Sequence, residues 1–447
     1  MTTSEPFRIG TGAGFSADRL DPAVDLAERG GLDCLVFECI GERTLAFGHR
    51  DRIADPEAGF NPWLARRLRA VLPPCARRRT RIVTNMGVAN PAGAAHAAAR
   101  VARELGLDGL SVAWLEGDDV ADQLGPTTPL PEIGSTIGEV GRPMVGANAY
   151  LGADAILPAL ELGADVVITG RVADPSLFLA PLRHAFGWAE DDWERLGRGT
   201  MVGHLLECAA QITGGYFADP PYKVVPGLAR VGFPFAEVAA DGTAVVTKLE
   251  GTGGCVTEQT VKEQILYEVH DPAAYVTPDV IADFSGATLE DDGPDRVRFG
   301  GGRGAPRPDL LKVTVAFDGG LVAEAGVSYA GPGAVDRAKL AAEVVEERMR
   351  GLHGLNGPLR IDLIGVQALH GTALDYPSEA RDVRLRAALR AGSRDEAELL
   401  LWEVEALLCC GPAGGGGYRG RITPSVITHN AFLPRERVRS RVEVIRA

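Results

Sequence analysis

One pattern occurs three times in the first 180 residues: an apolar strand, a glycine-containing turn, and then Asp-Pro or Asn-Pro at the start of a helix. The copies end at Asp21-Pro22, Asn90-Pro91 and Asp174-Pro175. Asp and Asn are favoured N-cap residues because their side-chain oxygens accept bonds from free backbone N–H groups, and proline fits the first helical position. Each copy predicts a strand-to-helix crossing, and the three crossings are expected to form one site above the strand ends of an α/β sheet.

Apolar runs separated by helices continue to about residue 215. Runs such as Ile82–Thr84, Met144–Ala147 and Val166–Ile168 are typical of strands buried on both faces of a mainly parallel sheet. We therefore expect an α/β fold, with an N-terminal doubly wound, Rossmann-like domain over residues 1–215 and a C-terminal α+β domain over residues 216–447. A TIM barrel needs eight strand–helix units, and only about six are present.

The second half has shorter strands and two long helices. Val313–Phe317, followed by Asp318-Gly319-Gly320, is typical of a strand that enters a hairpin turn. Helices are expected around residues 335–350 and 395–408, and the glycine-rich segment 410–420 is expected to be a loop.

Composition excludes several classes of function. The net charge of -14, from 46 basic and 60 acidic residues, argues against broad nucleic-acid binding. No run of about 20 apolar residues and no signal-peptide pattern is found, so we expect a cytoplasmic protein that does not bind membranes. Seven irregularly spaced cysteines fit reduced thiols, and eight scattered histidines give no support to a metal site. We expect neither a metal nor a cofactor.

Glycine-rich turns are the first candidates for anion binding. Gly10, Gly12 and Gly14 follow the first strand and could hold a phosphate or carboxylate, but their spacing departs from the dinucleotide-binding motif. A tight turn that needs positive φ is an equal alternative. Gly253 and Gly254 form a second turn before a helix and could close over the ligand.

The third crossing carries the strongest candidate. Arg171 lies where a strand ends and a helix begins, and its guanidinium group is well suited to carboxylate or phosphate. The start of the helix at Asp174 and Ser176 would add backbone N–H groups and the helix dipole. Asn90 is the corresponding candidate at the second crossing. The alternative is that Arg171 pairs with Asp174 and only fastens the loop.

Polar residues at other strand ends are candidate catalytic groups. Asn85, Asn148 and Tyr150 could orient a carbonyl or stabilise an enolate. Glu38, directly after the second strand, could act as a general base if partial burial raises its pKa.

Two further features have less specific interpretations. Cys39 lacks a nearby histidine and is more readily a small buried side chain than a nucleophile. His204 and Glu207 are three residues apart on an expected helix, and a hydrogen-bonded pair is the preferred interpretation. The alternatives are an acid–base pair and half of a metal site whose other half is missing.

Together, the segments 8–15, 84–93, 168–176 and 251–254 resemble the acyclic terpene utilisation A (AtuA) family. The resemblance covers roughly residues 6–350 and weakens beyond about residue 360, where the small appended domain of some members is not recognised. It implies catabolism of branched terpenoid acids as coenzyme A thioesters, by hydratase or lyase chemistry. It brings no set of catalytic residues.

These observations favour a cofactor-independent lyase or hydratase that acts next to the carbonyl of a small carboxylic acid or acyl-CoA thioester. Two alternatives stay open: a non-catalytic, ligand-binding subunit of an acyl-CoA enzyme complex, and a nucleotide-dependent enzyme. The expected partners are the small-molecule ligand, a small subunit in place of the appended domain, and further copies of the chain in a homo-oligomer.

Overall fold

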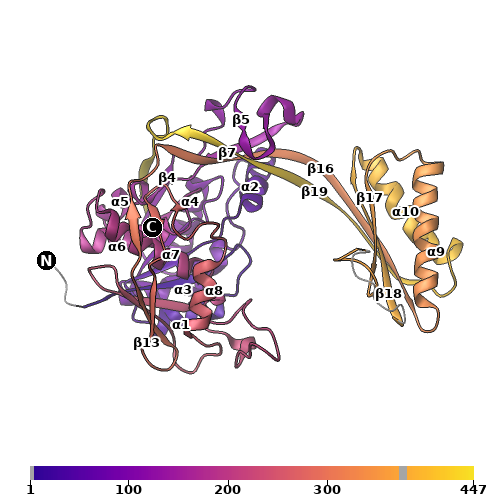
Figure 1. Ribbon diagram of the computed structural model, residues 1–447. Coiled ribbons are helices and arrows are strands. Elements are labelled where there is room, and N and C mark those ends of the chain that lie inside the picture. Colours follow the sequence, from indigo (N-terminus) through magenta and orange to yellow (C-terminus); the bar gives the residue numbers. More distant parts are fainter. Residues whose placement is uncertain (1–4, 372–379) are drawn as a thin grey trace. The chain divides into compact units, whose positions relative to one another are not determined.

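The computed structural model describes residues 5–371 and 380–447. The chain divides into two compact units, one formed by the residues up to Phe317 together with Thr428–Ala447, and the other by Asp318–Ile427 (Figure 1). The second unit is thus inserted into the first. The boundary expected at residue 215 lies inside the first unit, because the strands that follow it continue the same sheet.

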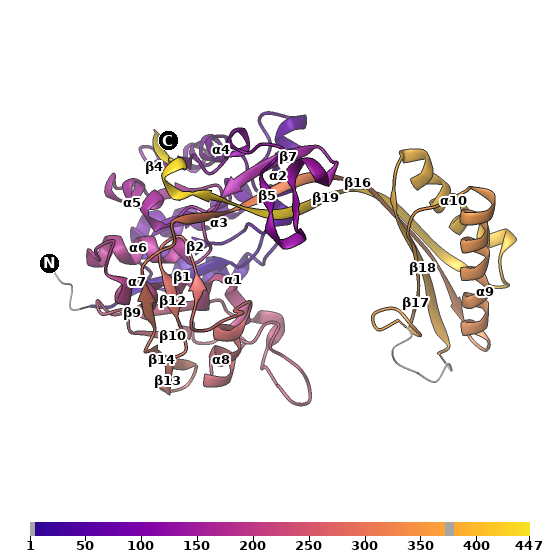
Figure 2. The same ribbon diagram turned by 45° about the horizontal axis from the view of Figure 1, so that its top comes forward.

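The first unit contains a ten-stranded sheet whose centre is parallel. The parallel strands are, in spatial order, β1 (Phe7–Ala13), β2 (Cys34–Phe37), β3 (Arg81–Thr84), β8 (Val166–Ile168) and β4 (Ser111–Glu116). Antiparallel strands extend both sides: β9 (Pro234–Val238), β10 (Ala244–Lys248), β14 (Arg296–Gly300) and β13 (Thr288–Asp291) next to β1 (Figure 2), and β20 (Arg441–Arg446) next to β4.

Helices cover both faces of this sheet. One face packs against α1 (Asp21–Arg29), α3 (Leu64–Arg78) and α4 (Pro91–Glu104), and the other against α5 (Ala153–Glu161), α6 (Ser176–Phe186) and α7 (Trp193–Glu207). Alternate residues of each strand enter the two cores, as in β2, where Leu35 packs on one side and Val36 on the other. The expected α/β fold with a doubly wound, mainly parallel central sheet is confirmed.

Smaller elements complete the first unit. They are α2 (Glu42–Ala54), α8 (Glu258–Leu266), β5 (Pro129–Leu130), β6 (Ser135–Thr136), β11 (Tyr275–Val276), β12 (Ile281–Asp283) and β15 (Arg303–Ala305). Within the described parts of the chain, no helix is long and apolar enough to cross a membrane.

The three Asx-Pro sequences start their helices in different ways. Asn90 is the N-cap of α4 and accepts a bond from the Gly93 backbone N–H at 3.0 Å, as expected. Asp21 is instead the first residue of α1, whose N-cap is Leu20. The helix α6 has Pro175 at its N-cap, and the preceding Asp174 is occupied by an ion pair with Arg171. The N-cap prediction is therefore right for one copy and wrong for two.

The strand expected at Met144–Ala147 forms, but not in the parallel sheet. It is β7 (Met144–Ala149), and it pairs antiparallel with the first part of β16 (Leu310–Ala330). Its last residues, Gly146–Ala149, are as fully buried there as a central strand would be. Burial alone therefore cannot tell which of the two sheets receives the strand.

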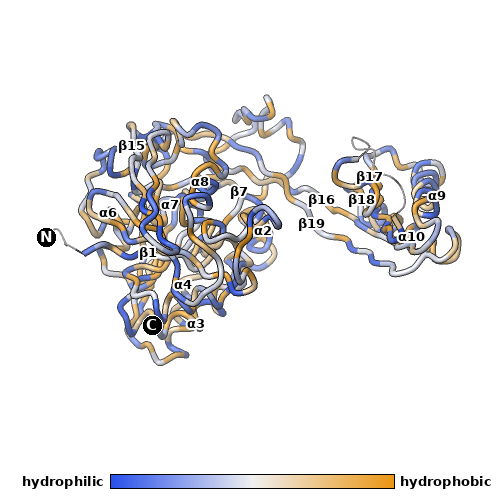
Figure 3. Tube along the Cα trace, turned by 60° about the horizontal axis from the view of Figure 1, so that its bottom comes forward, coloured by the Kyte–Doolittle hydropathy of each residue, from blue (hydrophilic) through white to orange (hydrophobic). Residues whose placement is uncertain are grey.

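The second unit has the order β16, α9 (Ala334–Glu347), β17 (Leu359–Ile364), β18 (Asp382–Ala391), α10 (Arg394–Cys410) and β19 (Gly416–Pro434). The strands lie in the spatial order β17-β18-β16-β19, which is a split β-α-β arrangement. Both helices pack on one face of this sheet (Figure 1). In Figure 3, α9 mixes hydrophilic and hydrophobic residues along its length, as expected for a helix with one face on a sheet.

The expected hairpin turn at Asp318-Gly319-Gly320 is wrong, because β16 continues through it. Gly319 lies so close to Ser425 that an added Cβ would be 2.8 Å from that residue, and Gly320 has a φ of 76°. The glycines thus permit an irregularity inside a long strand. The two long helices are confirmed as α9 and α10, whereas the loop expected over 410–420 is wrong from Gly416 on, where β19 begins.

Candidate functional site

A cavity of about 700 Å³ lies in the first unit, at the carboxyl ends of β1, β2 and β8. Parallel strands direct the loops that follow them to this edge, which is where α/β proteins bind ligands. Polar side chains in its wall include Asp18, Glu38, Glu42, Tyr150, Arg171, Asp174, Glu207, Gln211, Glu268 and Lys312. Apolar side chains include Phe15, Ile40, Ala173, Pro175, Leu310, Leu311 and Phe432.

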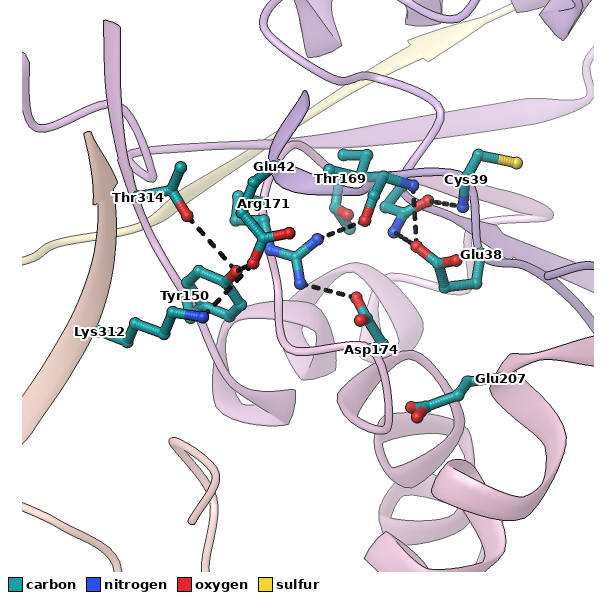
Figure 4. A network of polar contacts seen from close by, with 12 residues as sticks. Glu38, Cys39, Glu42, Tyr150, Thr169, Arg171, Asp174, Glu207, Lys312 and Thr314 are labelled. Carbon is teal, nitrogen blue, oxygen red and sulfur yellow. Dashed lines mark hydrogen bonds and ion pairs between the residues drawn. The ribbon is translucent and has the colours of Figure 1, made fainter. Parts of the chain in front are cut away.

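Glu38 is the first residue after β2, and its side chain is buried in the cavity wall (Figure 4). Its Oε1 atom accepts two bonds, from the Asn85 Nδ2 atom at 2.9 Å and from the Ile40 backbone N–H at 2.8 Å. Burial, with a contribution from the nearby Asp174 carboxylate, raises the pKa of Glu38 well above its ordinary value. A carboxyl with a raised pKa can exchange protons near neutral pH.

Asn85 acts behind this carboxyl and is not part of the cavity wall. It is fully buried at the end of β3, and its Oδ1 atom accepts a bond from the Cys39 backbone N–H at 2.7 Å. Its two amide atoms therefore fix the loop after β2 and orient Glu38. The structure thus gives Asn85 a positioning contact where the sequence suggested direct assistance to an enolate.

Arg171 lies in the cavity wall and has protein partners on two of its nitrogens. It donates to the Ile40 carbonyl at 2.7 Å and to Asp174 Oδ1 at 2.8 Å, and its guanidinium carbon is 4.1 Å from the centre of the Tyr150 ring. Despite burial, the neighbouring Asp174, Tyr150 and Glu38 raise its pKa, so Arg171 stays charged. The pair with Asp174 that the sequence left as an alternative does form, and both side chains line the cavity.

Tyr150 lies between acidic and basic side chains at the same end of the cavity (Figure 4). Its hydroxyl donates to Glu42 Oε1 at 2.6 Å, and the Lys312 Nζ atom is 3.4 Å from the same oxygen. Burial alone would raise the pKa of Glu42, but the bond from Tyr150 and the charges of Arg171 and Lys312 lower it to about 2. This end therefore presents a phenol and two cations, with one firmly ionised carboxylate.

Glu207 is the last residue of α7, and its carboxyl forms another part of the wall. Its Oε1 atom is 2.9 Å from the Nδ1 atom of His204 one turn earlier, so the hydrogen-bonded pair expected from their spacing is confirmed. Burial raises the pKa of Glu207 to about 7, and the charge of nearby Asp174 contributes. The sequence had flagged the pair but not its place in the cavity.

The charge balance of the wall is strongly acidic. Six carboxyl side chains face two cationic ones; the acids are Asp18, Glu38, Glu42, Asp174, Glu207 and Glu268, and the cations are Arg171 and Lys312. Burial raises the pKa of four of the acids: Asp18, Glu38, Asp174 and Glu207. Protonation of such groups removes much of the repulsion that an anionic ligand would otherwise meet.

Most of the candidate glycines lie outside the cavity wall. Gly10 and Gly12 are within β1, where an added Cβ would be 2.6 Å from Leu32 and 2.5 Å from the Phe37 ring. These glycines therefore allow close packing and do not form an exposed phosphate cradle. Gly14 does line the cavity, and an added Cβ there would be 2.5 Å from the Cys208 backbone.

The second glycine turn is also filled by the protein itself. Gly253 donates from its N–H to the Arg230 carbonyl at 2.7 Å, and Gly254 donates to the Pro226 carbonyl at 2.7 Å. The turn packs against the segment 226–231 and is not part of the cavity wall. Thr257 caps the helix α8 that follows.

Asn90 and Asn148 line a separate cavity of about 370 Å³. The Asn148 side chain contacts His49 at 2.5 Å and Asp118 at 2.9 Å, and the same Asp118 carboxylate accepts the backbone N–H of Arg171 at 2.7 Å. Asn148 and Asp118 thus support the Arg171 loop from behind. They do not join Tyr150 in the larger cavity, although the sequence grouped them with it.

Two other candidates have structural contacts. The Ser176 hydroxyl donates to the buried Asp279 carboxylate and does not line the cavity. Cys39 is fully buried, the Arg67 guanidinium is 3.0 Å from its sulfur, and burial raises its pKa. A buried thiol of this kind fits the small apolar side chain that was the preferred interpretation. Among the residues that the structure describes, no group of three or more His, Cys, Asp or Glu side chains could hold a metal ion.

Sequence patterns did not assign six polar residues of the cavity wall to a site: Asp18, Glu42, Glu207, Gln211, Glu268 and Lys312. Lys312 lies near the start of β16, more than 130 residues from every other charged group of the cavity except Glu268 and Glu207. No local pattern marks such a position. For Glu207, the spacing of three residues from His204 indicated a side-chain pair, although it did not place the pair in the cavity.

Fold and cavity together define an α/β protein with a ligand-sized, carboxyl-rich site at its strand ends. Residues 7–444 match the family described as Acyclic terpene utilisation family protein AtuA, so the chain belongs to this family. The match continues well beyond residue 360, where the resemblance was expected to weaken. No curated protein matches the chain. Among solved structures, the de novo designed protein Ferredog-Diesel is similar, with 16% identity, coverage of 23% of this chain and 85% of that chain, and a TM-score of 0.16.

Proposed function

We propose that this AtuA-family protein is a cofactor-independent lyase or hydratase that acts next to the carbonyl of a carboxylic acid or acyl-CoA thioester. Membership of the family supports a role in acyclic terpene utilisation. The observation that carries the reaction class is the Glu38 carboxyl, which is buried in the cavity wall, oriented by Asn85 and shifted to a higher pKa. Proton transfer at the carbon beside a carbonyl requires such a group.

Other groups of the same cavity support the second requirement of this chemistry. Removing or adding a proton beside a carbonyl passes through an enolate, whose oxygen carries developing negative charge. Tyr150, Lys312 and Arg171 supply a phenol and two positive charges at one end of the cavity. In this proposal Tyr150 keeps the role suggested by the sequence, and Lys312 and Arg171 replace Asn85 and Asn148.

The remaining wall suits a branched hydrocarbon chain. Phe15, Leu310, Leu311 and Phe432 add apolar surface to the cavity. Binding sites for small molecules commonly combine such surface with a few convergent polar groups, and volumes of this size hold a medium-sized ligand. The nucleotide-dependent alternative loses its main support, because the glycines that suggested it pack against the protein's own backbone and side chains.

Two thioesters test the proposal. Wild-type protein is mixed in D₂O with isovaleryl-CoA, which reports exchange of the α-hydrogen, and in a second assay with 3-methylcrotonyl-CoA, which reports hydration of the double bond. We expect both reactions in the wild type and a loss of about 10²–10⁴-fold in both for Glu38→Gln. Glu403→Gln, in the second unit, is the matched control and should react like the wild type.

The outcomes separate the alternatives. Thioester binding, seen as a higher unfolding temperature, without turnover in either assay would contradict the enzyme proposal and favour a non-catalytic binding subunit. Equal rates for the wild type and Glu38→Gln would contradict the role of Glu38.

A further inference from the structure

We propose that Glu207, positioned by His204, is the second proton-transfer residue of the cavity and acts on the water or hydroxyl group of the reaction. This inference rests on the proposed lyase or hydratase function and adds a residue that the family resemblance does not assign. It stands on the contacts of the two side chains, on the rings that hold His204, and on one oxygen that the protein leaves open.

The His204 ring is fixed from several sides. It is fully buried, its centre is 5.1 Å from that of the Tyr275 ring, and it stacks on the Phe284 ring at 5.6 Å. Its Nε2 atom lies 3.3 Å from the Ile265 carbonyl oxygen. A carbonyl only accepts hydrogen bonds, so this contact assigns a proton to Nε2.

The other ring nitrogen then shares a proton with the carboxyl. The Nδ1 atom of His204 is 2.9 Å from Glu207 Oε1. Either Glu207 is protonated and donates to Nδ1, or His204 carries both protons and donates to the carboxylate. The pair can therefore take up or release one proton without moving a heavy atom, and its two groups titrate together.

The second oxygen of Glu207 is buried and has no hydrogen-bond partner among the described residues. The side chain keeps only 8% of its surface exposed, and across residues 5–371 and 380–447 no hydrogen-bond partner lies within reach of Oε2. A buried carboxyl oxygen without a partner costs free energy, and this residue forms part of the cavity wall. Its position is suited to a hydrogen bond with a ligand hydroxyl or an attacking water.

The positions of Glu207 and Glu38 in the cavity support separate roles for the two carboxyls. Glu207 comes from the end of α7, whereas Glu38 comes from the end of β2, and Asp174 lies near enough to both for its charge to raise the pKa of each. Figure 4 shows the carboxyls of Glu38, Asp174 and Glu207 on the same side of Arg171. Two carboxyls that reach one cavity from different elements can serve two atoms of one substrate.

The step balances with water as the co-reactant. In the hydration direction, Glu207 takes a proton from water as the water oxygen forms a bond to the β-carbon, and the π electrons of the double bond move toward the carbonyl to give an enolate. The Glu38 carboxyl then gives its proton to the α-carbon. The proton on the Glu207–His204 pair leaves to solvent, and Glu38 is reprotonated. Dehydration runs through the same transfers in reverse.

The test compares hydration with α-hydrogen exchange in the same variants. Glu207→Gln should lower hydration of 3-methylcrotonyl-CoA by about 10²–10⁴-fold, while exchange of the α-hydrogen of isovaleryl-CoA, which needs Glu38, stays near the wild-type rate. Glu403→Gln is the control, because it also replaces a buried glutamate that contacts a histidine. Hydration by Glu207→Gln at the wild-type rate would overturn the inference.

A wild type that shows neither reaction would contradict the proposed function itself, so the two failures are distinguishable. His204→Gln provides a second measurement if Glu207→Gln does not fold. The contact with His204 lowers the pKa of Glu207, so its loss should move the acid limb of the hydration rate to higher pH. A lower rate with an unmoved limb would contradict the positioning role.

Discussion

Each unit of the molecule buries one glutamate beside a histidine, and the two pairs have opposite character. In the first unit the Glu207 side chain is hydrogen-bonded to His204, and burial raises its pKa to about 7. In the second unit Glu403 contacts His353 at 2.6 Å and also accepts two bonds from Arg348, at 2.5 and 2.9 Å. These bonds and the charges of Arg348 and His353 lower the pKa of Glu403.

The difference lies in the number of partners. Both oxygens of Glu403 are used by the protein, so this carboxylate fastens α10 to the segment 348–353. Glu207 keeps one oxygen without a partner in the described chain and faces a cavity. The two carboxyls are equally buried but differ in their partners: Glu403 has a structural role, whereas the partners of Glu207 are consistent with the reactive role that we propose for it.

The largest effect is expected from removing the buried cation of the first unit. Arg171→Ala leaves Asp174 and Glu38 without their neutralising charge and should destabilise the protein by about 3–5 kcal/mol, since one partner of a buried pair is lost. Arg348→Ala in the second unit is the comparison, because that arginine is about half exposed. Unfolding in urea measures the free energy of unfolding of both variants. Equal losses in the two variants would contradict the expected difference between the two arginines.

The next effect concerns pH. Glu207 and His204 both have a raised pKa in the folded state, so they bind more protons folded than unfolded, and their contribution to stability falls as pH rises. For Glu207 the window runs from about 4.5 to about 7, and the change is up to roughly 3 kcal/mol. The stability of the wild type relative to Glu207→Gln should therefore decrease between pH 5 and pH 8. If the difference in stability between the wild type and Glu207→Gln stays constant over this pH range, the pKa of Glu207 is not raised, and the contrast with the lowered pKa of Glu403 is contradicted.

A smaller effect on stability is expected when glycine is replaced by alanine, and it depends on whether the added Cβ meets other atoms. Gly12→Ala places a Cβ 2.5 Å from the Phe37 ring and should cost about 1–3 kcal/mol through overpacking. Gly416→Ala in the second unit meets no atom within 4 Å and should leave the unfolding temperature nearly unchanged. If Gly12→Ala unfolds like the wild type, the close packing of β1 against Phe37 does not limit the side chain at this position.

The smallest effect is expected for Glu403→Gln. Its carboxylate has a lowered pKa, so its contribution to stability is present at neutral pH and is lost as pH falls through the folded-state pKa. The variant should unfold at a temperature lower by about a few degrees at pH 7, and the difference should shrink in acid. A difference that grows in acid would have the wrong sign for this ion pair.

Local sequence patterns predicted the parallel strands well, because β2, β3 and β8 are short apolar runs bounded by helix starts. They did not predict which sheet receives β7, since its partner strand begins at Leu310, some 160 residues later. The Asp-Gly-Gly sequence at residue 318 looks the same in a hairpin turn and in an irregular strand. Such differences are set by distant partners.

In the candidate site, too, local patterns predicted some features, and distant partners determine the others. Glu38, Tyr150, Arg171 and Asp174 could be predicted because each lies in the segment that follows a strand, and the loops after parallel strands meet at one edge of the sheet. Whether Asn85 and Asn148 face the ligand or support its neighbours depends on angles that the sequence does not encode. The glycines of β1 were misjudged because a residue without a side chain serves close packing as readily as anion binding.

The insertion of the second unit between Phe317 and Thr428 has a consequence for synthesis. The strand β20 pairs with β4 and closes one side of the ten-stranded sheet, yet it leaves the ribosome only after the whole of the second unit. Until then β4 presents an open edge, which is a site for incorrect pairing. A nascent chain therefore completes its inserted unit before its first one, and the order of maturation runs opposite to the order in which the units begin.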